Sequence, residues 1–90
     1  MHAVVVRVTI QDFDAAREGL VTQIVPRVSQ APGFVAGYWT RSEDGGSGLG
    51  TVVFESEEAA RAVADMIQSQ PPDEGVTLDG VEVREVVAHA

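Results

Sequence analysis

The sequence predicts one α+β domain over residues 1–90, with a four-stranded antiparallel sheet and two helices on one of its faces. The first observation behind this prediction is length, because 90 residues can bury one hydrophobic core but not two. The second is the spacing of apolar residues, which indicates strand, helix, strand, strand, helix and strand in that order. Right-handed crossovers in this order place both helices on the same side of the sheet.

The first half of the chain predicts a strand followed by a helix. Residues 2–10 alternate, with a β-branched aliphatic residue at each even position from 4 to 10 and a partly apolar set on the other side. Residues 11–29 repeat apolar side chains every three or four positions, and Asp12 or Asp14 can cap the start of this helix. Because Pro26 lacks a backbone N–H, we expect a kink there and a last turn that reaches about Ser29.

The second half predicts a hairpin, a helix and a final strand. Residues 34–41 alternate as a second strand, and the stretch SEDGGSG turns the chain into a third strand, LGTVVFE. Ser56 is expected to cap a second helix, whose apolar stripe lies between residues 60 and 67 and which ends at SQPPDEG. The last strand is expected over residues 81–88, after a turn at Asp79 and Gly80.

Composition excludes several classes of protein. With no cysteine, the chain has no disulfide, no thiolate nucleophile and no thiolate metal site. A net charge of −8 argues against nucleic acid and anionic lipid as partners. No apolar run reaches the roughly 20 residues of a membrane helix, and the N-terminal residues lack the basic flank of a signal peptide. We therefore expect a cytoplasmic protein without a membrane partner.

The predicted sheet has one face that no helix covers. Whichever side of the first strand meets the helices, apolar residues remain on the other side, either the valines at even positions or Ala3 and Val5. Monomers rarely leave an apolar patch of that size exposed. We therefore expect a homodimer that forms through the uncovered face of the sheet.

Three stretches make the chain resemble the dimeric α+β barrel superfamily, and within it the small proteins of the antibiotic biosynthesis monooxygenase type. They are the valine-rich opening strand, GLVTQIVPRVSQAPGFVAGYW, and VFESEEAARAVAD, which joins the third strand to the second helix. The resemblance covers essentially the whole chain. It implies a ferredoxin-like β-α-β-β-α-β fold, a dimeric α+β barrel in which two sheets face each other, and a cavity between sheet and helices in each subunit.

The resemblance also implies a function. Within this family the expectation is a cofactor-independent monooxygenase that acts on a small hydrophobic or aromatic compound and needs no metal. The alternative is a non-catalytic small-molecule-binding or regulatory module with the same dimer. Haem-degrading relatives use an axial histidine, an asparagine and a tryptophan, whereas this chain has no asparagine and only two histidines, at its ends. We expect His2 and His89 to be solvated and not to bind a metal.

Apolar and aromatic side chains are the candidates for the cavity wall. They are Phe34, Tyr38, Trp39, Phe54, Ile24 and Met66. Adjacent strand residues point to opposite faces, so at most one of Tyr38 and Trp39 borders the cavity, and Phe34 should lie on the side of Tyr38. No catalytic residue is assigned, because the chain has no G-x-S-x-G turn and no histidine placed to activate a serine. Arg41, next to acidic residues at the hairpin, is expected to be solvated, with anion binding as the alternative.

Overall fold

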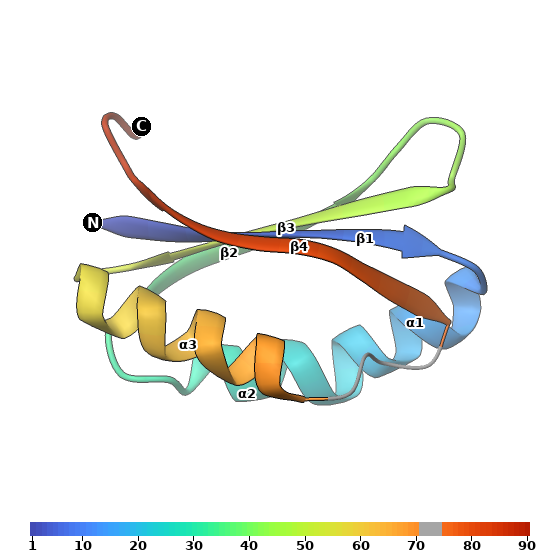
Figure 1. The fold of residues 1–90 in the computed structure, drawn as a ribbon, viewed down its shortest axis with the longest axis horizontal. Helices are drawn as coiled ribbons and strands as arrows, with labels where there is room; N and C mark the ends of the chain where they lie inside the picture. Colours follow the sequence, from blue (N-terminus) through green and yellow to red (C-terminus); the bar gives the residue numbers. More distant parts are fainter. Residues whose placement is uncertain (71–74) are drawn as a thin grey trace.

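A computed structural model of the chain describes residues 1–70 and 75–90 (Figure 1). Its strands are β1 (His2–Ile10), β2 (Phe34–Arg41), β3 (Ser47–Phe54) and β4 (Val76–Glu85). Its helices are α1 (Phe13–Gly19), the π-helical turn η1 (Leu20–Ile24), α2 (Val25–Ser29) and α3 (Glu57–Ser69). The predicted order of elements is confirmed. No helix in these two ranges has the length and apolar character needed to cross a bilayer.

The four strands form one antiparallel sheet in the order β2-β3-β1-β4, and the helices lie on one of its faces (Figure 1). The predicted α+β class is therefore confirmed, and the arrangement is compatible with a ferredoxin-like fold. Even-numbered residues of β1 point towards the helices and odd-numbered ones point away. We call the two sides of the sheet the covered face and the open face. The β2–β3 loop and the C-terminal segment project on the side of the open face (Figure 1).

The first helical segment runs without interruption from α1 through η1 to α2. The Asp12 side chain accepts a hydrogen bond from the Ala15 N–H at 3.2 Å, as expected for a helix cap. An α-helix would bring the Pro26 ring against the carbonyl of Thr22. The turn before the proline is instead π-helical, and the Val25 N–H donates to the Leu20 carbonyl, five residues back.

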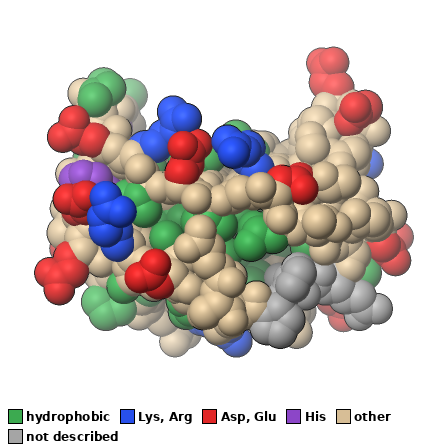
Figure 2. Space-filling model, in the orientation of Figure 1, with side chains coloured by type: hydrophobic (Ala, Val, Ile, Leu, Met, Phe, Trp, Pro, Cys, Tyr) green, Lys and Arg blue, Asp and Glu red, His purple; other side chains and the backbone are tan. Residues whose placement is uncertain are grey.

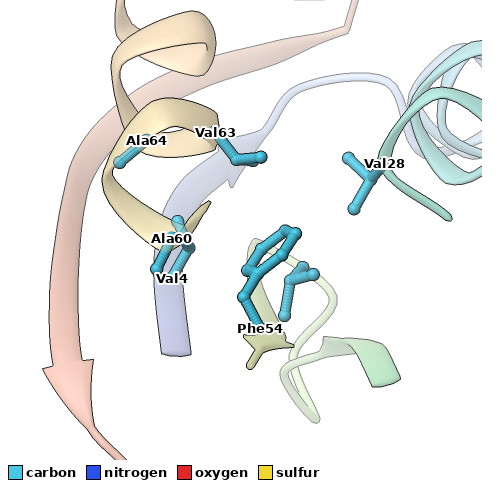
Figure 3. Packing of buried hydrophobic residues seen from close by; sticks show 7 residues of the cluster. Val4, Val28, Phe54, Ala60, Val63 and Ala64 are labelled. Atoms are coloured by element: carbon cyan, nitrogen blue, oxygen red, sulfur yellow. The ribbon is translucent and has the colours of Figure 1, made fainter. Parts of the chain in front are cut away.

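The core fills the half of the covered face that lies under α2 and α3. Phe54 of β3 is fully buried and lies between Val4, Val28 and Val63, which come from β1, α2 and α3 (Figure 3). Helix α3 presents the small residues of its apolar stripe to this cluster and is capped by Ser56, whose hydroxyl accepts from the Ala59 N–H at 3.1 Å. These contacts fix both helices on the covered face.

The last strand differs from its prediction at both ends. Asp79 and Gly80 do not form a turn before it; they lie within β4, where Asp79 is the extra residue of a bulge opposite Arg7 and Val8. Aspartate and glycine are common in turns, but they also fit a bulge, and at a bulge the strand continues. The strand ends at Glu85, three residues earlier than expected. The prolines expected to end the second helix lie outside the described residues, and α3 ends at Ser69.

A second bulge corrects the predicted position of Phe34. The pairing of β2 with β3 shifts between Phe34 and Ala36, so Phe34 pairs with Phe54 and packs against the core on the covered face. Strict alternation had placed Phe34 on the side of Tyr38. The extra residue, Val35, is 45% exposed. The bulge thus adds an aromatic ring to the core without changing the faces of the residues that follow.

Candidate functional site

A chamber of about 390 Å³ lies between the covered face of the sheet and the first helical segment. Its wall includes residues from all four strands and from α1, η1, α2 and α3. Most of the lining is aliphatic or aromatic, as in typical small-molecule sites. On the face of the molecule shown in Figure 2, hydrophobic side chains gather between the sheet and the helices, and charged side chains surround them.

Glycines in β3 leave the space for this chamber. On the covered face, β3 carries Phe54 and Val52 at one end and Gly50 and Gly48 towards the other. The two large side chains fill the core, and the two glycines place no side chain under α1 and η1. The same strand therefore closes one half of the covered face and leaves the other half hollow.

The indole of Trp39 lies across two of the strand glycines. A Cβ at Gly50 would lie 3.0 Å from Trp39 Cδ1 and Nε1, and a Cβ at Gly37 would lie 2.8 Å from Trp39 Cη2. A Cβ at Gly37 would force the ring to shift, and a Cβ at Gly50 would make a tight contact with it. The ring is thus held against the sheet and forms part of the chamber wall. Within the described residues, the indole N–H has no hydrogen-bond partner, so it is free to donate to a ligand.

Three arginines supply most of the polar groups in the wall. Arg17 lies on α1, Arg27 on α2 and Arg41 at the end of β2. The Arg41 guanidinium carbon lies 3.8 Å from the centroid of the Phe13 ring. Arg27 Nη1 donates to Oε1 of Gln70 at 2.9 Å. No aspartate, glutamate or histidine of the described ranges lines the chamber.

Two carboxyl groups of the described residues have a shifted pKa, and both lie outside the chamber. The Gly46 N–H and the Ser42 hydroxyl donate to the Asp44 carboxylate and hold its pKa below the ordinary value. Hydrogen bonding and charge from Arg61 lower the pKa of Glu57, one turn earlier on α3. Both groups are exposed and stabilise local structure, so neither supplies an acid or a base to a bound molecule.

The structure separates the six predicted site residues into three groups. Trp39, Ile24 and Met66 line the chamber. Phe34 and Phe54 pack in the core, with ring centroids 6.2 Å apart and planes at 79°. Tyr38 lies on the open face and is 70% exposed. Of the two adjacent aromatic residues, therefore, Trp39 borders the chamber and Tyr38 does not.

Neither histidine is part of a metal centre in the described part of the chain. His89 is exposed in the segment after β4, and no group of three or more potential metal ligands is present in residues 1–70 and 75–90. His2 lies on the covered face of β1, and its Nδ1 is buried with no hydrogen-bond partner within those residues, so the prediction that His2 is solvated is wrong for this nitrogen. The structure brings no carboxylate cluster to either ring.

Sequence reasoning missed Arg17 and Arg27 and treated Arg41 as a solvated loop residue. Helical spacing could have indicated Arg17, because it follows Phe13 by four residues and so shares its side of the helix. The sequence also contained an indication of the glycines in the wall. Gly48 and Gly50 occupy alternate positions of one strand, so one side of that part of the strand carries no side chain.

The open face has an apolar half and a charged half. Its apolar residues lie on β1, β2 and β3, where Tyr38 pairs with Thr51 and Leu49 is 41% exposed. On the side of β4, Glu82 accepts a hydrogen bond from Arg7 at 3.4 Å and forms an ion pair with Arg84 at 3.0 Å. Glu82 thus pairs with both arginines of this half, whereas the apolar half has no cover within the described chain.

Comparison with known proteins does not assign a family. No family model matches the sequence, and no curated protein matches it. The fold and the chamber are therefore the observations from which a function can be argued.

Proposed function

We propose that this protein binds a small hydrophobic molecule in the chamber between its sheet and its helices. The observation that carries the proposal is the chamber itself, about 390 Å³ of space with a mainly apolar wall. Close packing normally fills the interior of so small a domain. Here Gly48 and Gly50 carry no side chain, so Val8 and the Trp39 indole lie close to the strand, and Trp39 provides an aromatic surface with one hydrogen-bond donor. This combination favours binding of an apolar or aromatic compound.

We also propose that the protein acts as a homodimer through its open face. The strand order β2-β3-β1-β4 with two crossovers supports a ferredoxin-like fold, and the resemblance to dimeric α+β barrels implies sheets that face each other. Tyr38 and Leu49 are the large apolar residues exposed on this face, and a second copy would cover both. The β2–β3 loop and the C-terminal segment project on the same side and would flank that partner (Figure 1).

A second candidate function is cofactor-independent oxygenation of a phenolic compound, favoured by the aromatic ring of Trp39 in the wall. In such a reaction a phenol and one O2 give a quinone and one water, so the substrate supplies all the electrons. The chain would bind the ring against Trp39, orient the phenolate oxygen towards the indole N–H and exclude water. The described lining offers no carboxylate or imidazole base, which favours binding as the first proposal.

Fluorescence of Trp39 tests the binding proposal directly, because it is the only tryptophan of the chain. A panel of apolar and phenolic compounds should include members that shift or quench its emission saturably and that raise the unfolding temperature. Oxygen uptake measured on the same samples separates the two functions. Turnover supports oxygenation, and stabilisation without oxygen uptake supports a binding module. Absence of any saturable change across the panel contradicts both functions.

A further inference from the structure

The charges around the chamber differ from those elsewhere on the molecule. Three of the six basic residues of the chain, all of them arginines, line the chamber, and no acidic residue of the described ranges does. The other three are Arg7, Arg61 and Arg84, and each forms an ion pair with a glutamate. The chain carries a net charge of −8, yet the described wall of its chamber is cationic. A wall of that sign attracts an anionic ligand.

Two of the wall arginines lie at the same end of the chamber. Arg41 stacks on Phe13, and Arg17 lies one helical turn after Phe13 on the same side of α1. Arg17 therefore shares the side of α1 that carries the ring on which Arg41 stacks. Arg27 lies ten residues further along the helical segment, where it donates to Gln70. It is thus separate from the pair.

Arg41 is exposed, and the contacts of its guanidinium leave its charge unused. The guanidinium stacks on Phe13, and a Cβ at Gly45 would lie only 2.7 Å from Arg41 Nη2, so the hairpin backbone closes the space beside it. Stacking on a ring leaves the N–H groups in the guanidinium plane free to donate. Among the described residues, neither Arg41 nor Arg17 forms an ion pair. Both guanidinium groups belong to the chamber wall, and a guanidinium is the side chain best suited to bind a carboxylate.

We propose that the ligand is an amphipathic acid whose carboxylate binds between Arg17 and Arg41 and whose apolar body extends along the chamber to Trp39. This inference rests on the proposed binding function, because it names the chemistry of the molecule that the same chamber takes. The apolar lining accommodates the body, and the arginine pair selects the charged end.

A matched pair of ten-carbon probes tests this inference. Decanoate and 1-decanol have similar apolar bodies and differ at the head group, and neither absorbs where tryptophan is excited. Titrations followed by Trp39 emission at low ionic strength should show decanoate binding about tenfold more tightly than 1-decanol, since a charge-assisted contact is stronger than a neutral one. Arg17→Gln and Arg41→Gln should each reduce this preference at least threefold, because each change weakens the binding of decanoate more than the binding of 1-decanol. Retained binding of 1-decanol also shows that the variants are folded.

Arg61→Gln is the matched control, because it removes the same charge from the exposed side of α3, away from the chamber. It should retain the full preference for decanoate. Equal affinities of the wild-type protein for the two probes overturn the inference while the binding function stands. An equal loss of preference in Arg61→Gln also overturns it, because net charge alone would then explain the effect. If neither probe changes the emission saturably, both the inference and the binding function fail.

Discussion

The covered and open faces of the same sheet are both apolar, yet they differ in what covers them. On the covered face, Val4, Val52 and Phe54 are at most 2% exposed because α2 and α3 pack over them. On the open face, Tyr38 is 70% exposed and Leu49 is 41% exposed. Strand alternation gives each face its own set of side chains, so one stretch of sequence can supply two hydrophobic surfaces. One copy of the chain provides a cover for only one of them.

The covered face is itself divided, and the division locates the site. Along β3 it passes from large side chains, which close the core, to glycines, which leave the chamber empty. Packing therefore stabilises one half, and the other half is free to take a ligand. The variants below test the contrast between the two faces and the contrast within the covered face.

The largest effect is expected at the centre of the core. Phe54→Ala removes a fully buried ring that contacts α2, α3 and Phe34, and it should lower the free energy of unfolding by about 3–5 kcal/mol. Tyr38→Ala removes a ring of similar size from the open face and should cost less than about 1 kcal/mol in the monomer. Urea denaturation measures both. Equal losses would show that the two faces do not differ in packing.

Within the covered face, Gly50→Ala should displace Trp39. The added Cβ would lie 3.0 Å from the indole Cδ1 and Nε1, so the ring must move, at a cost of about 1–3 kcal/mol. Trp39 emission should shift, and binding of apolar ligands should weaken. Gly46→Ala is the control, because a Cβ there meets only the side chain of Asp44, at 3.4 Å, and is remote from the indole. Unchanged emission in Gly50→Ala would contradict the close contact between ring and glycine.

The open face is tested by adding a charge to it. Tyr38→Glu places a carboxylate where the proposed second copy would contact the sheet, and burying that charge should weaken the dimer at least tenfold. Ala62→Glu adds the same charge at an exposed position of α3 and should leave the dimer intact. Sedimentation velocity over a range of concentrations measures both. A wild-type chain that stays monomeric and folded at micromolar concentration would refute the dimer itself.

The order of the elements was predictable from the sequence because it depends on periodicity, which is local. The switch from alternation in β1 to helical spacing after Asp12 is visible without any tertiary information. The bulges at Phe34 and Asp79 were not visible, because a bulge depends on the pairing of two strands and its residues fit other structures equally well. One extra residue was enough to move Phe34 to the other face.

The site was predictable only in part, for a related reason. Aromatic and aliphatic residues in strands and helices indicate an interior, and Trp39, Ile24 and Met66 do lie in the chamber wall. The sequence does not distinguish residues of the chamber wall from residues of the filled core. Phe54 is an aromatic residue in a strand, as Trp39 is, but it belongs to the core. The role of Arg41 depends on its contact with Phe13, 28 positions away in the chain, and only the fold brings the two together.

The smallest effect is expected at the β2–β3 loop, which projects beside the open face. The Asp44 carboxylate accepts from the Ser42 hydroxyl at 2.7 Å and from the Gly46 N–H at 2.8 Å, and these bonds lower its pKa. A group whose pKa is depressed by folding stabilises the folded state above its unfolded pKa, and this contribution is lost as the pH falls through the folded pKa. Acid should therefore loosen the loop.

An NMR titration of Asp44 measures this pKa, and Ser42→Ala should raise it towards the ordinary aspartate value because one of the two donors is removed. The Gly46 N–H remains, so the rise should be incomplete. Affinity for chamber ligands should not change, because neither Ser42 nor Asp44 lines the chamber. An unchanged pKa in Ser42→Ala would contradict the hydroxyl contact. A change in ligand affinity would show instead that the loop beside the open face is coupled to the chamber under the helices, and the two faces could no longer be treated as independent.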